Sequence, residues 1–251
     1  MRYFINLSYL GTPFHGWQYQ PNAISVQEIL EEALTRVLRS PIKVTGAGRT
    51  DTGVHARLMV AHFEAEIPPK TFENLVYLLN QYLKSEIVIL SIFPVIGTAH
   101  ARFDATLRTY EYHIVSKKDP FTNGLAYFFR EPLDIPLMNK ASQLLVTFKD
   151  FQAFSKTNTD VKTFLCDISS ASWSTKRDGY VFTITANRFL RNMVRAIVGT
   201  LLDVGVHKIT IEELKNIINS KERSKAGFSV PAHGLYLTDI QYPKNIMIDN
   251  G

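Results

Sequence analysis

Short apolar strand patterns alternate with amphipathic helical patterns along this chain, in two successive rounds with a β-α-β-β-like rhythm. Strands are expected over 3–9, 42–45, 58–65, 86–95, 109–115, 163–173, 180–186 and 235–242, and helices over 26–38, 72–83, 137–148, 189–204 and 211–218. Strands that mix with helices in this way favour an α+β fold of two halves. We place the boundary near residues 97–108 and assign 1–104 and 105–251 to the two domains.

Local signals set the ends of several elements. Ser25 and Glu28 stand at the spacing of a capping box, in which each side chain bonds the backbone N–H of the other, so a helix should start at residue 26. Asp178 and Gly179 are a favoured pair for a tight turn between two strands, which predicts a hairpin there.

The chain has 251 residues, a formal net charge of +5 and a single cysteine, Cys166. One cysteine excludes a disulfide framework and any cysteine-rich zinc site, so a reducing compartment is the default. No apolar run approaches the roughly 20 residues of a membrane helix, and the N-terminus lacks the pattern of a signal peptide. We therefore expect a cytoplasmic protein with no membrane association. The charge permits a polyanionic partner without requiring one.

A polar loop over 46–56 (GAGRTDTGVHA) lies between two strand patterns. An ordinary surface turn is one interpretation of it, and three functional motifs that resemble it fail. A dinucleotide-binding loop needs a glycine where Asp51 stands and a helix afterwards. An aspartic protease needs a second carboxylate that shares a proton with Asp51, which the neighbouring Arg49 opposes. His62 and Glu64 match half of a zinc-deaminase motif whose other half needs two cysteines, so His62 should be an ordinary strand residue.

The helical pattern from Met193 onward is apolar nearly all round, which indicates a buried helix, yet Arg195 stands within it. An unpaired buried charge is costly, so a buried guanidinium there needs an anionic partner. One alternative is an arginine that reaches solvent at the helix edge, and the other is a buried ion pair with a catalytic carboxylate. Arg188 and Arg191 stand three residues apart and would reach phosphates from the start of the helix.

Basic and aromatic residues interleave over 100–103 (HARF) and 108–112 (RTYEY). Alternating aromatic residues on a strand usually face a core. On a nucleic-acid surface, by contrast, aromatic rings stack on bases and arginines hold phosphates. Both interpretations stay open on these residues alone.

Together these segments resemble one family, the tRNA pseudouridine synthases of the TruA type. The resemblance covers essentially the whole chain in order and spacing, and its most specific stretch is RTDxGVHA over 49–56. It is carried by 9–18 (YLGTPFHGWQ), 48–56 (GRTDTGVHA), 101–103 (ARF), 108–110 (RTY), 192–199 (NMVRAIVG) and 233–237 (HGLYL). One departure is Leu10, where the family usually has an aspartate. It lies outside the catalytic stretch, so we expect it to affect at most the local turn or an RNA contact.

The resemblance implies isomerisation of uridine in tRNA, typically at positions 38 to 40 of the anticodon stem-loop. The uracil leaves C1′ at N1, turns and rejoins through C5, so no redox change occurs and no cofactor or metal is expected. Asp51 matches the catalytic aspartate and Arg195 the basic residue that pairs with it. Tyr110 matches the active-site tyrosine, whose ring would stack on the uracil and whose hydroxyl would serve proton transfer at C5. Whether Asp51 attacks C1′ or C6, or supports a glycal route, stays open.

The resemblance also implies a fold and partners. The fold would be two ferredoxin-like halves whose mixed, mostly antiparallel sheets join, with a catalytic cleft between them. A homodimer would bind tRNA across both subunits. The residues expected to contact the RNA are Arg49, Arg102, Tyr110, Arg188 and Arg191. The rival hypothesis is a non-catalytic tRNA-binding module or chaperone on the same scaffold, which would not need Asp51 and Arg195 together.

Overall fold

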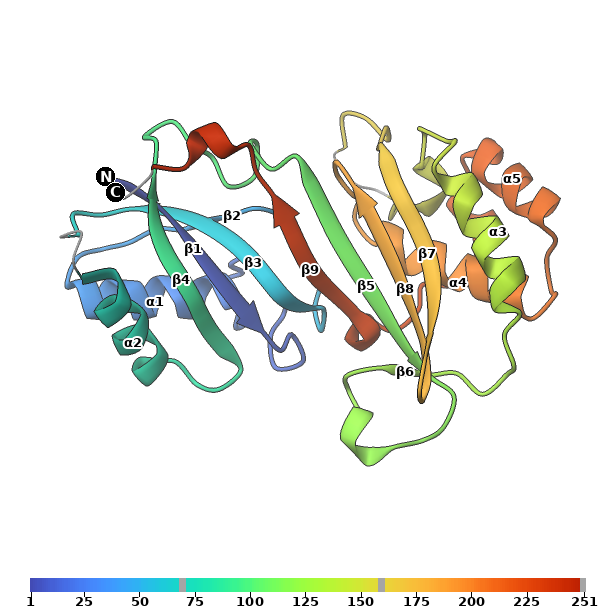
Figure 1. Cartoon of the computed structure of the whole chain (residues 1–251), viewed down its shortest axis with the longest axis horizontal. Helices are drawn as coiled ribbons and strands as arrows, with labels where there is room; N and C mark the ends of the chain where they lie inside the picture. The colour runs from blue at the N-terminus through green and yellow to red at the C-terminus, as the bar shows by residue number, and fades with distance from the viewer. Residues whose placement is uncertain (68–70, 158–160, 249–251) are drawn as a thin grey trace. The chain divides into compact units, whose positions relative to one another are not determined.

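The computed structural model describes residues 1–67, 71–157 and 161–248 (Figure 1). Within them the chain forms two compact units, Met1–Leu107 with Leu237–Gly251, and Arg108–Tyr236. Each unit combines helices with a mostly antiparallel sheet, so the predicted α+β class is confirmed. The predicted domains, 1–104 and 105–251, stay a prediction. The same holds for the joined sheets and the cleft.

The first unit is built on the strand order β4-β1-β3-β9, with the short β2 beside β3. These strands are β1 (Arg2–Tyr9), β2 (Thr45–Gly46), β3 (His55–Glu64), β4 (Ile87–Val95) and β9 (Leu235–Gln241). β1 is antiparallel to both of its neighbours. β9 comes from the far end of the sequence and lies beside β3, in the place of the second strand of a ferredoxin-like unit.

Two helices, α1 (Val26–Leu38) and α2 (Phe72–Tyr82), lie side by side in this unit (Figure 1). Tyr3, Ile5, Leu7 and Tyr9 of β1 are buried on one face, as period-two patterning requires, and Phe4 is buried on the other. Among them Tyr3 packs its ring against Phe72 of α2, with centroids 5.5 Å apart. The capping box of α1 is confirmed, because Ser25 Oγ accepts from Glu28 N at 3.2 Å and the Glu28 carboxylate accepts from Ser25 N at 3.4 Å.

The second unit has the strand order β5-β8-β7, with the short β6 parallel to β5. Its strands are β5 (Leu107–Val115), β6 (Tyr127–Phe128), β7 (Ile168–Lys176) and β8 (Gly179–Ala186), and its helices are α3 (Ile135–Leu145), α4 (Met193–Gly205) and α5 (Ile211–Ser220). Tyr112, Phe182 and Trp173 lie directly opposite one another across the three strands, and all are buried. The predicted hairpin is confirmed, with Lys176 paired to Gly179. In the described part of the chain, each helix is too short or too polar to cross a bilayer.

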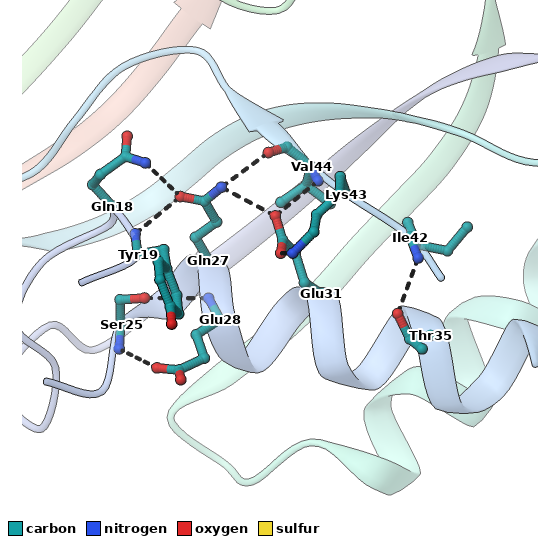
Figure 2. Close-up of polar contacts among 10 residues, drawn as sticks. All are labelled: Gln18, Tyr19, Ser25, Gln27, Glu28, Glu31, Thr35, Ile42, Lys43 and Val44. Carbon is teal, nitrogen blue, oxygen red and sulfur yellow. Dashed lines mark hydrogen bonds and ion pairs between the residues drawn. The ribbon is translucent and has the colours of Figure 1, made fainter. Parts of the chain in front are cut away.

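The strand predicted over 42–45 is wrong except at its last residue, since β2 is only Thr45–Gly46. The side chains of α1 take the hydrogen bonds that a neighbouring strand would supply (Figure 2). Val44 N donates to Glu31 Oε1 at 3.1 Å, and Gln27 Nε2 donates to Val44 O at 3.1 Å. Ile42 N donates to Thr35 Oγ1 at 3.0 Å. Ile42 and Val44 are buried, so the apolar pattern of this segment reflects its burial beside α1 and not pairing with another strand.

The helix predicted to start at Phe189 begins four residues later, at Met193. Asn192 has a φ of 67°, in the left-handed region that a helix interior does not allow. Arg188 and Arg191 therefore both precede the helix. Their contact with phosphates from the start of the helix stays a prediction. The predicted strand over 163–173 likewise begins only at Ile168.

Candidate active site

Asp51 lies in a tight turn just before β3. Val54 N donates to Asp51 O at 3.1 Å, which closes the turn. Gly53 has a φ of 80°, a conformation that favours glycine. Asp51 is half-buried, whereas the preceding Thr50 is buried.

The segment that follows β1 clamps this turn from one side. Tyr9 Oη and Thr50 Oγ1 share a buried hydrogen bond of 2.9 Å. Gly11 N donates to His55 Nδ1 at 2.9 Å, also in a buried position, and Trp17 N donates to Thr50 O at 3.2 Å. The residues on both sides of Asp51 are thus fixed by the chain over 9–17.

Two glycines of this segment allow the close approach. A Cβ on Gly11 would lie 2.0 Å from Val54 O, and one on Gly16 would lie 2.4 Å from Thr50 O. Both distances are far below contact, so neither position accepts a larger residue without moving the Asp51 turn. The motif over 9–18 is therefore the support of the RTDxGVHA stretch. Leu10 is 44% exposed and its N–H donates to Glu86 O at 2.9 Å, so it stands apart from this clamp.

Arg49 is exposed beside the Asp51 turn. Its Nε donates to Gln18 Oε1 at 3.2 Å, a partner that the sequence did not indicate. Gln18 ends the YLGTPFHGWQ motif, so the same segment that clamps the turn also contacts the neighbouring cation.

In the second unit, Tyr110 is half-buried on β5. Its ring meets that of Phe189 edge-on, with centroids 5.1 Å apart and an interplanar angle of 88°. Two residues earlier, Arg108 Nη1 donates to Asn187 O at 2.7 Å. These contacts attach the segment before α4 to β5 and fix the tyrosine ring.

Arg195 is half-buried on α4, which departs from the fully buried helix that its surroundings predicted. Its Nε donates to Val230 O at 2.6 Å, and Val230 N donates to Arg195 O at 3.3 Å. This partner occupies one of the five guanidinium donors. The carbonyl of Val230 therefore orients the guanidinium within its own unit.

Val230 ends a segment, residues 226–230, that lies across α4 and that we call the strap. The strap contacts the helix closely, since Gly227 N donates to Thr200 Oγ1 at 2.9 Å and a Cβ on Gly199 would lie 1.8 Å from Phe228 O. Arg223 holds the strap from the other side by donating to Gly227 O at 3.0 Å. Sequence reasoning missed the strap, and the only signal was the pair of glycines.

Asn192 adds a second link between the start of α4 and the strap. Its Nδ2 donates to Ser229 Oγ at 2.6 Å, and Arg223 Nη2 donates to the same oxygen at 2.8 Å. Burial lowers the pKa of Arg223 from its usual value. The NMVRAIVG motif thus contains residues that position Arg195: Asn192 and Gly199 hold the strap, and the strap holds the arginine.

The basic–aromatic cluster separates into a core part and a surface part. Tyr112 is buried, and burial raises its pKa well above the usual range. Phe103 is 73% exposed, and the Arg102 guanidinium lies 5.7 Å from its ring centroid. The core interpretation therefore holds for Tyr112. The part with Arg102 and Phe103 is exposed, and its contact with nucleic acid stays a prediction.

His62 is buried and is an ordinary strand residue, as predicted, with its Nδ1 accepting from Ala101 N at 3.1 Å. It lies against His100, with ring centroids 4.7 Å apart. Burial, aided by the charges of His100 and Arg2, lowers the pKa of His62 to about 4. A neutral imidazole at this position holds the turn that carries Arg102.

The predicted site residues fall into two groups, one in each unit. Asp51, Arg49 and Arg102 belong to the first unit, and Tyr110, Arg188, Arg191 and Arg195 to the second. Arg191 is exposed and Arg188 half-buried on the segment before α4. Over the described ranges, no three His, Cys, Asp or Glu side chains gather as metal ligands would.

Comparison with known proteins gives one consistent match. The model of a family described as tRNA pseudouridine synthase matches residues 6–104 and 141–243. A protein named tRNA pseudouridine synthase A from Parabacteroides distasonis is 52% identical over 245 residues, covering 98% of this chain and 97% of that protein. Proteins of the same name from Bacteroides fragilis and Porphyromonas gingivalis are 51% and 50% identical over 98% of this chain, and 98% and 99% of their own lengths are covered.

Proposed function

The chain belongs to the tRNA pseudouridine synthase family, whose members are isomerases that act on tRNA, and we propose that it converts uridine to pseudouridine at positions 38 to 40 of the anticodon stem-loop with Asp51 as the catalytic carboxylate. The family membership supports the reaction. The finer assignments to the stem-loop and to Asp51 are our proposal.

The clamp around Asp51 is the observation that most favours its catalytic role. Three hydrogen bonds, two of them buried, hold Thr50 and His55 on either side of the carboxylate, and two glycines allow the close approach of the clamping segment. Asp51 itself is left half-buried. A solvent-facing turn without function does not need so rigid a support, whereas a nucleophile or a transition-state stabiliser must be held in place.

The reaction breaks the N1–C1′ bond of uridine and forms a C5–C1′ bond. C5 loses its hydrogen as a proton and N1 gains a proton, so the product is an isomer of the substrate. Asp51 serves it as a nucleophile at C1′ or C6, or by supporting a glycal intermediate. Arg195 stabilises the negative charge of the Asp51 carboxylate through its opposite charge. Tyr110 stacks on the extruded uracil and relays the C5 proton. The Asp51–Arg195 ion pair comes from the family resemblance and is part of the proposal.

The basic residues complete the proposal by contacting phosphates of the RNA. They are Arg49, Arg102, Arg188 and Arg191, three of which are exposed and one half-buried. We further propose that the enzyme acts as a homodimer, with tRNA bound across both subunits. A tRNA substrate and a single cysteine favour the cytoplasm as its location.

The test is to map pseudouridine in tRNA that has been incubated with purified wild-type protein and with Asp51→Asn. We expect pseudouridine within positions 38 to 40 from the wild type and none from the variant, with nearly unchanged tRNA affinity, since phosphate contacts supply most of it. The control is Asp119→Asn, because Asp119 is exposed and caps a short turn that asparagine also caps. Pseudouridine formation by Asp51→Asn would remove Asp51 from the mechanism. A wild type that binds tRNA but modifies none would favour the RNA-binding module.

A further inference from the structure

Arg49 stands at the end of an unbroken chain of hydrogen bonds that begins inside the first unit. Its Nε donates to Gln18 Oε1 at 3.2 Å, and Gln18 Nε2 donates to Gln27 Oε1 at 3.0 Å. Gln27 Nε2 then donates to Glu31 Oε1 at 3.1 Å and to Val44 O at 3.1 Å. Figure 2 shows the part of this chain from Gln18 to Val44, which joins the loop before α1, the helix itself and the segment after it. We call these side chains, Gln18, Gln27 and Glu31, the relay.

Two backbone groups, one beside each polar atom of the Gln27 side-chain amide, determine the orientation of that amide. Tyr19 N can only donate, and it lies 3.0 Å from Gln27 Oε1. Val44 O can only accept, and it lies 3.1 Å from Gln27 Nε2. An inverted amide would oppose donor to donor and acceptor to acceptor, so only one orientation is allowed. Gln27 thereby uses both of its N–H donors and accepts two hydrogen bonds.

The fixed orientation passes on to Gln18. Because Gln27 presents its carbonyl oxygen, Gln18 must turn its own NH₂ group toward it. Its carbonyl oxygen then faces the opposite way, where it receives the Arg49 Nε–H. The relay therefore has a direction, and it presents an acceptor to a residue that only donates.

Glu31 anchors the inner end of the relay. Its side chain is only 11% exposed, and it accepts from Lys43 Nζ at 2.7 Å and from Val44 N at 3.1 Å as well as from Gln27. A carboxylate with three donors, one of them charged, is well satisfied in a nearly buried position. Gln27 is thus held by a rigid group and not by a mobile surface side chain.

We propose that Gln18 and Gln27 are positioning residues that hold the Arg49 guanidinium in one orientation beside the Asp51 turn, ready to bind a phosphate of the substrate RNA. The bond to Gln18 occupies one of five N–H donors, and none of the other four bonds to a residue that the structure describes. A guanidinium with a fixed plane loses less conformational freedom when it forms a bidentate phosphate contact. This inference rests on the proposed function only through the role given to Arg49.

The first experiment replaces Gln18 by methionine, which keeps the length of the side chain and removes the acceptor. We expect KM for tRNA to rise about fivefold, equal to about 1 kcal/mol, with kcat within about twofold. Gln27→Met should act in the same direction through Gln18. The matched control is Gln20→Met in the same loop, since the Gln20 side chain donates to His15 O and forms no hydrogen bond to the relay in the part of the chain that the structure describes. All three variants should keep the wild-type melting temperature within a few degrees.

A double-mutant cycle with Arg49→Ala separates positioning from general structural support. If Gln18 acts through Arg49, adding Gln18→Met to Arg49→Ala should change neither KM nor the Kd of tRNA further. A Gln18→Met effect of equal size in both backgrounds, or no effect on the wild type, would overturn the proposal. The Kd cycle stands without any catalytic measurement. Failure of the proposed function, seen as a wild type that makes no pseudouridine, is therefore distinguishable from failure of the relay.

Discussion

The edge-on contact between Tyr110 and Phe189 involves the tyrosine ring and not its hydroxyl, so the two parts of the side chain can be tested separately. The ring is fixed by Phe189 and by its place on β5, and both remain in a phenylalanine variant. The hydroxyl is the only group lost. A stacking role and a proton-transfer role for Tyr110 therefore predict different outcomes for one substitution.

Tyr110→Phe should bind tRNA as the wild type does and should release the C5 hydrogen about 100-fold more slowly, the size of a typical general acid–base contribution. The measurement is single-turnover release of tritium from tRNA labelled at C5 of uridine. Tyr180→Phe, on the neighbouring β8, is the matched control for loss of a tyrosine hydroxyl. Release at the wild-type rate by Tyr110→Phe would reduce Tyr110 to a stacking platform.

His62 gives a prediction for stability. Its pKa in the folded protein is about 4, lowered chiefly by burial, against the usual 6.5. Between pH 6.5 and pH 4, His62 is therefore protonated in the unfolded chain and neutral in the folded protein. The free energy of unfolding falls as the pH drops through this range, and above it His62 has no effect on stability. The charged and titratable groups that face His62 are His100, Arg2, Glu64 and Asp104.

Between pH 7 and pH 5 the loss of stability due to His62 should be about 2 kcal/mol. His62→Gln keeps an acceptor for Ala101 N and cannot titrate, so its stability should fall less over the same range. Urea unfolding of both proteins at the two pH values measures this difference. Equal slopes for the two proteins would mean that His62 titrates normally in the fold. The lowered pKa of His100 acts in the same direction in both proteins.

At the scale of elements, sequence patterns predicted most helices and strands and failed where side chains replace backbone partners. The segment over 42–44 has the burial of a strand, but Gln27, Glu31 and Thr35 bond its backbone from α1. Such substitution depends on which helix residues face the segment, which a local pattern does not contain. Phe189 joins the apolar period of α4, yet the left-handed Asn192 starts the helix after it.

The site shows the same division. Asp51, Tyr110 and Arg195 were predicted as site residues because they belong to motifs with a recognisable chemistry. The strap that holds Arg195 has no such motif. Its bond to Arg195 is a backbone carbonyl, that of Val230, which any residue would supply. The strap constrains the sequence only where its backbone approaches that of α4 too closely for a side chain, at Gly199 and Gly227.

The strap predicts an effect of filling Gly199. A methyl group there would lie 1.8 Å from Phe228 O, so the strap must move away from α4. Gly199→Ala should destabilise the protein by about 2 kcal/mol, in the range for overpacking, and should lower activity as Val230 O leaves Arg195 Nε. Urea unfolding and tritium release measure the two effects. The control is Gly97→Ala, whose Cβ meets nothing within 4 Å. Unchanged stability and activity in Gly199→Ala would contradict the role of the strap.

At the scale of the whole molecule, the chain returns to its first unit at the end. The described residues from Leu237 onward belong with those before Arg108, and β9 lies beside β3 in the sheet. Sequence rhythm predicts an α+β chain in two parts but not this return, because strand pairing between distant segments leaves no periodic signal. The site residues are likewise distributed over both units, with Asp51 in one and Tyr110 and Arg195 in the other. In a homodimer, Asp51 would then have a choice of two arginines, one in its own chain and one in the partner.

Mixed dimers decide between these arrangements. If each site takes Asp51 and Arg195 from one chain, as we propose, a purified dimer of Asp51→Asn with Arg195→Met contains no intact site and should be inactive. If each site takes them from different chains, one of its two sites is intact and about half of the wild-type activity returns. The reciprocal control pairs a wild-type chain with a chain that carries both substitutions. It should retain about half of the activity under our proposal and none under the shared arrangement. Activity in the first dimer together with its absence from the second would therefore show that the catalytic pair forms between subunits.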